Sequence, residues 1–352
     1  MSSLQPVEVN TETAGSDFWA RFHPYRRLRH SETHPDDPPE PDETVEANLK
    51  RADPFDFKYR YEISRDGQML SWFTASTAKP TNPEYETSKH LMWANWSVHP
   101  DHRRHGIGRT WIPLVLELME RHHSTTLSTG TDEESGHAFL KWFGAEPKLT
   151  GAENRLQFAE VDWDMVRSWA EEGPRRSPNT RLKVYDGRLP RELWDEYCPQ
   201  LSSMLNTMPW EQLDHGEIVV TPAIMEEWYA RMDLSGEMHH VMFTREPDGI
   251  ISGITDMYYA PYNPKMIGQA FTGVRPDARG RGLGKWLKAA MLLHVRELYP
   301  DLLRVTTDNA ASNAPMLAIN KRLGFKQYRA GSDYQISRDR LQARARELAA
   351  AR

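Results

Sequence analysis

Two short segments of this chain combine closely spaced glycines with cationic side chains, a composition suited to binding a phosphate ester. The first runs from Val98 to Arg109 (VHPDHRRHGIGR) and the second from Val274 to Lys285 (VRPDARGRGLGK). Because glycine lacks a Cβ, such a turn can adopt positive φ and direct several backbone N–H groups at one anion. A helix beginning at the turn would add its own unpaired N–H donors. The chemistry that fits best is the binding of a pyrophosphate.

The charge around the second segment supports this interpretation. Five cations lie close together between residues 271 and 288, against the single acid Asp277; they are Arg275, Arg279, Arg281, Lys285 and Lys288. The whole chain has a net charge of −6, so this cluster is a local reversal of sign, as a polyphosphate ligand requires. A tight turn with solvated cations is the alternative for either copy taken alone.

Two other glycine-rich motifs are excluded by the residues themselves. A P-loop requires Ser or Thr after Gly-Lys, whereas Gly284-Lys285 is followed by Trp286. A dinucleotide-binding fingerprint requires the spacing G-x-G-x-x-G, whereas Gly280, Gly282 and Gly284 alternate.

The two segments are copies of one pattern, V-x-P-D-x-R-x-x-G-x-G, at a constant offset of 176 residues in a chain of 352. A strand-like run precedes each copy (90–98 and 266–274) and a helical run follows it. In the first copy Pro113 lies within the helical run, so that helix is expected to start late or to kink. Strand-like pairs further upstream, at 55–63 with 68–77 and at 238–244 with 250–259, predict a hairpin in each half.

The repeat and the length predict two domains. We expect an N-terminal domain at 1–170, a linker at 171–180 where the sequence EEGPRRSPNT is charged and proline-rich, a C-terminal domain at 181–337 and a C-terminal helix at 338–352. The acidic, proline-rich stretch 34–43 is expected to be a solvated loop.

Composition narrows the class of protein. The single cysteine, Cys198, excludes an internal disulfide and a cysteine-based zinc site. No signal sequence or membrane span is recognisable, so a soluble, cytoplasmic protein with no membrane partner is expected. The negative net charge argues against a nucleic-acid partner and is compatible with a cationic substrate.

Histidines do not change this assessment. His99, His102 and His105 recur every three residues but lie on the glycine-rich turn itself, so no metal site is predicted. His239 and His240 open a predicted strand, where the two side chains must face opposite sides of the sheet, and we expect an ordinary core or surface role for them.

The pattern V-x-P-x-x-R-x-x-G-x-G between a strand and a helix resembles the acetyl-CoA-binding motif of the GNAT superfamily of N-acetyltransferases. The order of elements in each half follows the GNAT order, and the second half also carries a later motif at 306–320, ending in Leu323-Gly324-Phe325. The resemblance implies an α/β (α+β) fold with two tandem GNAT domains, each a mixed, mostly antiparallel sheet flanked by helices. The chain is similar to a bacterial group of tandem GNAT proteins that includes mycothiol synthase.

The resemblance implies acetyl-CoA as cosubstrate and assigns residues to its binding. In the second half these are Phe271, Thr272, Val274, Arg279, Gly280, Arg281, Gly282, Leu283, Gly284, Lys285, Asn309 and Asn313. A second possible site in the first half comprises Val98, Arg103, Arg104, Gly106, Ile107, Gly108 and Arg109. A backbone N–H on the strand before the turn would polarise the thioester carbonyl while an amine attacks directly, without an acyl-enzyme.

The catalytic residues depart from the family pattern. Many GNAT enzymes place a Tyr four residues before the final Gly-Phe as the acid for the leaving thiolate, but this chain has Asn320 there, and an amide cannot act as a general acid. Tyr328 is the alternative proton donor. The strand before the turn offers Gln269 and Thr272 in place of the usual Glu, so Asp256 on the preceding strand is the candidate base.

The first half departs further, with Leu140 at the position of the acid and Glu133 at the position of the CoA-contacting amide. We therefore expect catalysis in the second half, while the first half binds CoA without turnover or only shapes the acceptor cleft.

Three functions remain open from sequence. The first is acetyl transfer to the primary amine of a small molecule in a ternary complex. The second is a CoA-binding regulatory protein or pseudo-enzyme, and the third is a mycothiol synthase-like role in thiol biosynthesis. The sequence does not identify the acceptor, the length of the acyl group or the oligomeric state.

Overall fold

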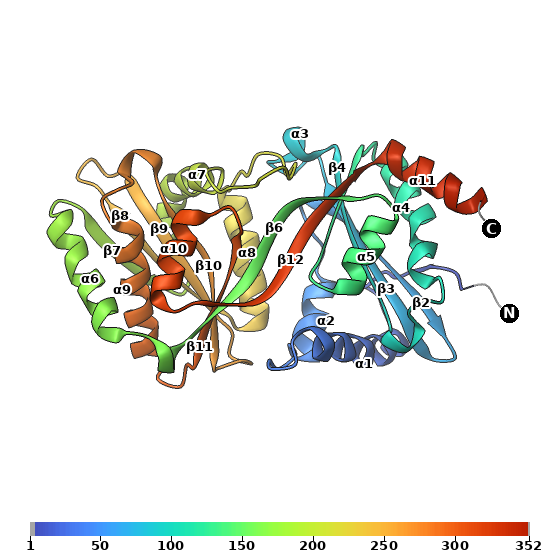
Figure 1. Cartoon of the computed structure of the whole chain (residues 1–352), viewed down its shortest axis with the longest axis horizontal. Helices are drawn as coiled ribbons and strands as arrows, with labels where there is room; N and C mark the ends of the chain where they lie inside the picture. Colours follow the sequence, from blue (N-terminus) through green and yellow to red (C-terminus); the bar gives the residue numbers. More distant parts are fainter. Residues whose placement is uncertain (1–3, 351–352) are drawn as a thin grey trace. The chain divides into compact units, whose positions relative to one another are not determined.

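The structure is a computed structural model that describes residues 4–350 and divides into two compact units. Unit 1 comprises Met1–Leu149, Trp210–Glu217 and Gly331–Arg352, and unit 2 comprises Thr150–Pro209 and Ile218–Ala330. Each unit contains a mixed, mostly antiparallel sheet with helices on both faces (Figure 1). The predicted fold class is thereby confirmed.

The elements of the first half of the chain form most of unit 1. Its strands are β1 (Val7–Glu8), β2 (Asp56–Arg65), β3 (Gln68–Ala78), β4 (Leu91–Val98) and β5 (Thr126–Thr131), and its helices are α1 (Ser16–Thr33), α2 (Asp42–Lys50), α3 (Tyr85–Ser88), α4 (Trp111–Arg121) and α5 (Glu134–Trp142). The strand order is β1-β2-β3-β4-β5-β12, with β4 and β5 parallel. The predicted hairpin turns at Asp66 and Gly67, which both adopt positive φ, as a tight two-residue turn requires.

Unit 2 repeats this arrangement. Its strands are β7 (Arg181–Asp186), β8 (Met238–Arg245), β9 (Ile251–Tyr259), β10 (Met266–Val274) and β11 (Arg304–Ala310), and its helices are α6 (Trp163–Arg176), α7 (Trp194–Leu205), α8 (Pro222–Ser235), α9 (Leu283–Leu298) and α10 (Ala314–Leu323). The strand order is β7-β8-β9-β10-β11-β6, with β10 and β11 parallel.

The last strand of each half pairs with the unit built mainly from the other half. Strand β6 (Glu146–Gln157) follows α5 in the chain, yet its residues 151–157 pair antiparallel with β11 of unit 2. Strand β12 (Lys326–Ser337) follows α10, yet its residues 332–337 pair antiparallel with β5 of unit 1. Each unit is therefore built from both halves of the chain.

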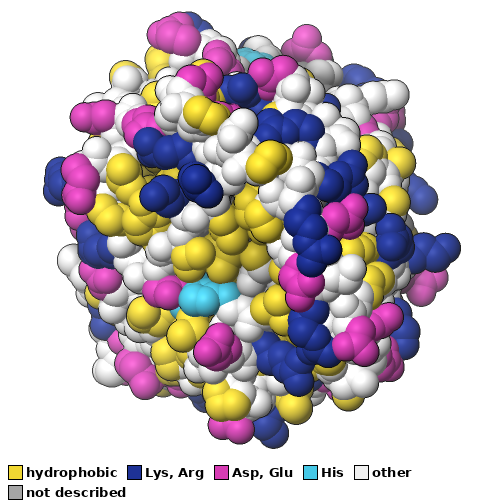
Figure 2. All heavy atoms as spheres, turned by 90° about the vertical axis from the view of Figure 1, so that its left-hand side faces the viewer, with side chains coloured by type: hydrophobic (Ala, Val, Ile, Leu, Met, Phe, Trp, Pro, Cys, Tyr) yellow, Lys and Arg dark blue, Asp and Glu magenta, His cyan; other side chains and the backbone are white. Residues whose placement is uncertain are grey.

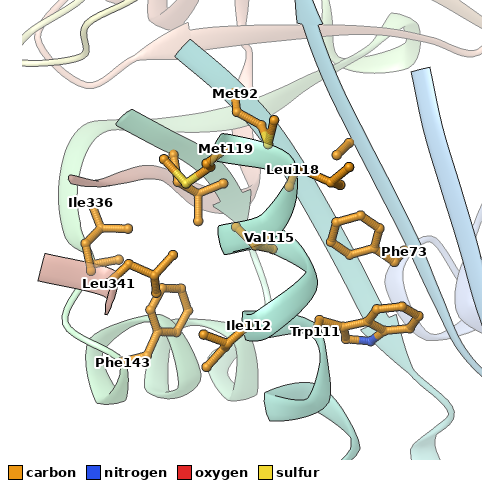
Figure 3. Packing of buried hydrophobic residues seen from close by; sticks show 14 of the residues in the cluster. Phe73, Met92, Trp111, Ile112, Val115, Leu118, Met119, Phe143, Ile336 and Leu341 are labelled. Carbon is orange, nitrogen blue, oxygen red and sulfur yellow. The ribbon is translucent and has the colours of Figure 1, made fainter. Parts of the chain in front are cut away.

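The helix that follows each of these two strands packs in the same unit as the strand. Helix α11 (Arg338–Ala350) places Leu341 in the core of unit 1, beside Ile336 of β12 and the α4 side chains (Figure 3). In unit 2, α6 packs against α9 so closely that a Cβ on Gly173 would lie 2.2 Å from the Trp286 ring. Burial of these apolar contacts favours the exchanged arrangement.

The unit boundaries consequently differ from the boundaries predicted at residues 170 and 181. The predicted linker 171–180 contains the last turns of α6, which ends at Arg176, and residues 150–180 belong to unit 2. Residues 210–217 and 331–337 belong to unit 1. A local pattern of proline and charge does not reveal strand pairing between segments far apart in the sequence, and this pairing sets the boundaries.

Helices cover both faces of the unit 2 sheet, and the alternation of strand residues decides which side chain faces which layer. On β8, Met242 packs with α9 and α6, whereas Val241 and Phe243 pack with α7 and α8. We refer to these as the α9 face and the α8 face. No helix within residues 4–350 is long and apolar enough to cross a bilayer.

Candidate functional site

The two glycine-rich turns have the same backbone conformation. In unit 2, Gly280 and Gly282 have φ of 81° and 84°; in unit 1, Arg104 and Gly106, at the same offset, have φ of 64° and 84°. A left-handed conformation costs a residue with a Cβ roughly 1–2 kcal/mol, so Arg104 is held there against its local preference. Both copies therefore adopt the left-handed turn conformation that the glycine-rich repeat predicts.

The helices after the turns start differently. Helix α9 begins directly at Leu283, whereas in unit 1 a 3₁₀ turn (Ile107–Thr110) precedes α4, which begins at Trp111. Pro113 lacks an N–H and is tolerated only in the first turn, so the α-helix cannot start earlier. The predicted late start is confirmed. The unit 2 turn thus directly abuts the N-terminus of a long α-helix, with its positive partial charge.

The arginine of the repeated motif forms a hydrogen bond with the end of the strand that precedes the turn. Arg279 Nε donates to the Val274 carbonyl at 3.2 Å, and Arg103 Nε donates to the Val98 carbonyl at 3.3 Å. Arg281 is also engaged, because it pairs with Glu246 at 2.9 Å. In unit 2, the groups left available to a ligand at the turn are therefore chiefly backbone N–H groups rather than these two cations.

Other residues assigned to the cosubstrate have structural roles in unit 2. Leu283 is buried, so only its backbone can face a ligand. The Lys285 ammonium lies 5.4 Å from the centre of the Trp169 ring. Asn313 caps α10 by accepting from Met316 N–H at 3.4 Å, so its side chain is already used within the protein.

In each unit the two parallel strands separate before the turn. The paired residues of β10 and β11 end at Gln269 and Thr307, and those of β4 and β5 end at Trp93 and Ser128. Beyond this point Arg275 N–H bonds to the β9 side, so strand alternation directs the N–H groups of Thr272 and Val274 toward β11. A ligand with amide groups can pair with this strand edge.

Unit 1 contains a cleft of about 930 Å³ at its turn. The end of β4, residues 102–109, Thr131 and the inner side of α5 line it. All seven residues of the second possible site predicted from sequence line this one cleft: Val98, Arg103, Arg104, Gly106, Ile107, Gly108 and Arg109. Its size is within the usual range for cofactor sites.

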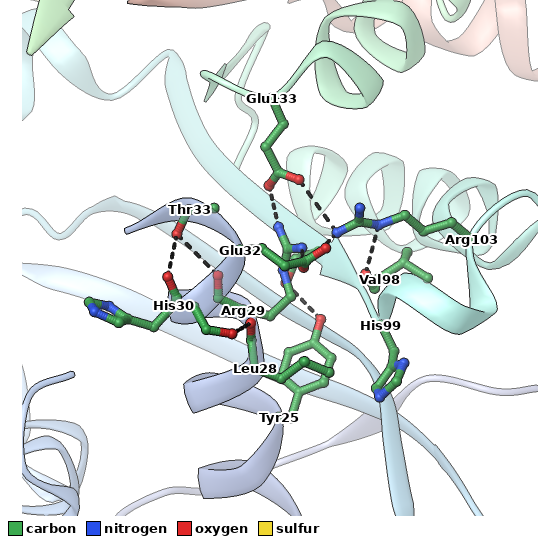
Figure 4. A network of polar contacts seen from close by, with 12 residues as sticks. Tyr25, Leu28, Arg29, His30, Glu32, Thr33, Val98, His99, Arg103 and Glu133 are labelled. Carbon is green, nitrogen blue, oxygen red and sulfur yellow. Dashed lines mark hydrogen bonds and ion pairs between the residues drawn. The ribbon is translucent and has the colours of Figure 1, made fainter. Parts of the chain in front are cut away.

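Four charged side chains form a network at this cleft (Figure 4). Glu133 pairs with Arg29 of α1 and lies 3.4 Å from Arg103, which itself pairs with Glu32 at 2.9 Å. Glu133, which occupies the position of the CoA-contacting amide in the family pattern, thus neutralises Arg29 and Arg103, two cations that would otherwise face a phosphate. Arg29 was missed in the sequence because α1 lies far upstream of the turn.

Three features of unit 1 bear on whether it could catalyse the reaction. The β3–β4 register is uninterrupted from Ser71–Val98 to Ser76–Trp93. Asn95 Oδ1 accepts from Thr129 Oγ1 at 3.0 Å and from Gly130 N–H at 3.3 Å, so its side chain bridges β4 and β5 where they separate. Leu140, at the position of the acid, is buried in the core.

Unit 2 has a β-bulge at the corresponding place. The β9–β10 register shifts between Gln269 and Thr272, which turns Phe271 onto the α8 face. At the bulge Phe271 N–H donates to Asp256 Oδ1 at 2.7 Å. The candidate base and the strand before the turn are therefore in direct contact.

Asp256 also faces a histidine that sequence reasoning placed in an ordinary role. His239 Nε2 lies 3.5 Å from Asp256 Oδ2, and its ring stacks on Tyr258. The Tyr229 hydroxyl accepts from Leu189 N–H at 2.8 Å and forms a second hydrogen bond with His239 Nδ1, 3.0 Å away, which holds the imidazole ring with Nε2 toward the carboxylate. The expectation that His239 and His240 face opposite sides is confirmed, but both are buried in polar networks.

Asn320 lies beside another predicted residue. Its Nδ2 donates to Asn309 Oδ1 at 2.7 Å, whereas its Oδ1 is buried and has no hydrogen-bond partner within the described chain. An orphaned buried acceptor is costly unless a ligand or water satisfies it, which fits a donor group at this site. Tyr328 lies on β12, where the Arg155 guanidinium is 3.5 Å from its ring centre.

A buried lysine lies on the other face of β10. Lys288 Nζ donates to Gln269 Oε1, and Gln269 Nε2 bonds to the Thr255 and Thr272 hydroxyls at 3.0 and 3.1 Å. Burial lowers the Lys288 pKa to about 7. Sequence reasoning counted Lys288 only as a cation near the turn, although it shares a helix face with Met291 and Val295, and that spacing was the available signal.

Comparisons with known proteins agree with this geometry. Residues 21–145 match the model of the Acetyltransferase (GNAT) family. A mycothiol acetyltransferase of Saccharomonospora viridis is 26% identical over 249 residues, which cover 67% of this chain and 73% of that protein. A mycothiol acetyltransferase of Salinispora arenicola is 38% identical over 95 residues, covering 26% and 30% of the two chains.

Among solved structures, a tandem GNAT protein from the clavulanic acid biosynthesis pathway superposes with a TM-score of 0.75 and 21% identity, covering 96% of this chain and 99% of that one. This similarity shows that the chain has the fold of a tandem GNAT protein, with one GNAT fold in each unit. The chain is thus similar to GNAT acetyltransferases in sequence over residues 21–145 and in fold over nearly its whole length.

Proposed function

We propose that the protein transfers an acetyl group from acetyl-CoA to a primary amine of a small molecule, and that the reaction takes place in unit 2. The observation that carries this proposal is the β10 bulge, which joins Phe271 to Asp256 beside the separated parallel strands. Unit 1 has no such interruption in the β3–β4 register, and Asn95 bridges the corresponding strands.

In unit 2, cosubstrate binding and acceptor activation take place on different sides of β10. On the β11 side, the N–H groups of Thr272 and Val274 pair with the pantetheine arm and stabilise negative charge as it develops on the thioester oxygen. The N–H groups at Gly280 and Gly282 and the N-terminus of α9 hold the pyrophosphate.

Asp256 and His239 face the acceptor from the α8 side. The neutral amine attacks the carbonyl carbon as the carbon–sulfur bond breaks, forming an amide and the CoA thiolate. Asp256 accepts the amine proton, and His239, oriented by Tyr229, stabilises the carboxylate in its working position. Asn320 cannot supply the thiolate proton, so its unpaired Oδ1 serves as acceptor for the thiol S–H after protonation from water.

Unit 1 binds acyl-CoA without turnover in this proposal. Its cleft carries the same turn conformation, and the cations Arg29, Arg103 and Arg104 line it, which supports phosphate binding. The Asn95 side chain bridges the strands where they separate, and the buried Leu140 provides no acid there.

A narrower candidate concerns the acceptor. The two relatives described above are mycothiol acetyltransferases, which favours an amine that is a thiol precursor. A regulatory, non-catalytic role is the remaining alternative, and the amide at Asn320 in place of an acid favours it.

The test is the release of free CoA thiol, measured colorimetrically with acetyl-CoA and a panel of small amines. Asp256→Asn is expected to lower kcat by about 10²–10⁴-fold with little change in acetyl-CoA affinity. Asp164→Asn is the matched control, because its side chain on α6 is 90% exposed and it should retain full activity. Failure of acetyl-CoA to bind either unit in calorimetry, or full activity in Asp256→Asn, would refute the proposal.

A further inference from the structure

Three potential metal ligands converge in unit 2, outside the turn and the bulge. Asp186 ends β7, His240 lies on β8 and His294 lies on α9. His240 Nδ1 is 2.5 Å and His294 Nε2 is 2.8 Å from Asp186 Oδ1, and one donor atom from each of the three residues lies within 4.8 Å of the other two. Residues 54 and 108 positions apart thus present two imidazole nitrogens and a carboxylate to one point.

The orientation of His240 is fixed by a second interaction. Its Nε2 bonds to the Tyr299 hydroxyl at 2.8 Å, so Nδ1 is the nitrogen that faces Asp186. Tyr299 is itself held by stacking on Tyr259, with ring centres 3.9 Å apart. Support of this kind for the far nitrogen is typical of histidines that ligate metals.

We propose that Asp186, His240 and His294 bind a divalent transition-metal ion of the zinc class, which fastens the edge strand β7 to β8 and α9. Two nitrogen donors and one oxygen favour such an ion over Mg²⁺ or Ca²⁺. Three protein ligands leave a coordination position for water, and solvent reaches it because the Asp186 side chain is 41% exposed and that of His294 is 24% exposed.

The ion would have a structural rather than a catalytic role. His294 follows Gly284 by nearly three helical turns, so the cluster lies about 15 Å along α9 from the turn. Figure 2 shows the side of the molecule on which α6, β7 and α9 lie, with a histidine surface beside an acidic side chain near its middle. The inference does not depend on the proposed acetyl transfer.

The test uses the full-length protein after treatment with a chelator. Calorimetric titration with ZnCl₂ should show one site, and Co²⁺ should produce visible absorption bands typical of nitrogen ligation. His294→Ala and Asp186→Asn, the latter preserving side-chain size, should each weaken Zn²⁺ binding by about 100-fold and abolish the Co²⁺ bands. Circular dichroism confirms that both variants are folded.

The control removes an exposed histidine elsewhere. His123 has a φ of 54°, which asparagine tolerates, so His123→Asn should leave Zn²⁺ affinity and the Co²⁺ spectrum unchanged. The proposal is overturned if the chelator-treated, unsubstituted protein binds no Zn²⁺. It is also overturned if folded His294→Ala and Asp186→Asn bind Zn²⁺ as tightly as the unsubstituted protein.

Discussion

Replacing Lys288 with methionine should change the way in which stability depends on pH. The Lys288 side chain is 2% exposed, and burial lowers its pKa from the model-compound value of 10.5 to about 7. Between these two pKa values the unfolded chain binds a proton that the folded chain does not, so the free energy of unfolding rises with pH in this window. The lysine therefore destabilises the fold most at and below pH 7 and progressively less as the pH approaches 10.5.

The magnitude follows from the two pKa values. Holding the amine in its buried place costs about 4 kcal/mol at pH 7 and about 2 kcal/mol at pH 9. Methionine removes this cost but leaves Gln269 Oε1 without its partner, a loss of about 1–3 kcal/mol that does not vary with pH. Lys288→Met should accordingly be more stable than the unsubstituted protein at pH 7, and its advantage should shrink by about 2 kcal/mol by pH 9.

Urea unfolding at pH 7, 8 and 9, followed by tryptophan fluorescence, measures this difference. The corresponding position of the repeat in unit 1 is Ile112, which shows that an apolar side chain suits it. Lys285→Met is the matched control, since it removes a cation from the same helix at a partly exposed position and its difference from the unsubstituted protein should stay constant with pH. If the Lys288→Met and unsubstituted curves run parallel from pH 7 to pH 9, the interpretation of Lys288 as a buried neutral amine is refuted.

Three further results are expected. Glu133→Gln should raise the affinity of the unit 1 cleft for acetyl-CoA about tenfold in calorimetry, because Arg29 and Arg103 lose their shared counter-ion; unchanged affinity would show that the cleft does not receive the phosphates. Gly282→Ala should weaken acetyl-CoA binding to unit 2 and cost roughly 1–2 kcal/mol of stability in urea unfolding, because its φ is 84°; a variant with unaltered binding would contradict the assignment of the turn. A chain divided after Arg176 should yield two fragments that do not unfold cooperatively alone and regain structure when mixed, as judged by circular dichroism, because each lacks a strand that the other supplies; an independently folded fragment would contradict this.

Much of the fold was predictable because it depends on local patterns. The repeat at an offset of 176 residues predicted two similar folds, and the strand-like runs 55–63 and 68–77 predicted a hairpin that the structure contains. Pro113 predicted the late start of α4, because the missing N–H acts on its own helix. The residues of the unit 1 cleft were predicted together since all seven belong to one continuous turn and its flanks.

The remaining features of the candidate sites depend on contacts between distant segments. His239 lies near Asp256 only because β8 and β9 pair in one register, and Arg29 reaches Glu133 only because α1 packs where Arg29 lines the cleft. The bulge in β10 has no distinctive local composition. It is recognised only from the register with β9.

By itself, the sequence determined the two glycine-rich turns and their flanking strands and helices, because these follow from glycine conformations and apolar periodicity over short distances. The tertiary structure decided which chain segments complete each unit, since β6 and β12 find their partners by hydrogen bonding across the chain rather than along it. It also decided the chemistry available at each turn. Burial sets the pKa of Lys288, and proximity brings together Asp256 with Phe271 and the three residues of the Asp186 cluster; neither quantity is encoded in the spacing of residues along the chain.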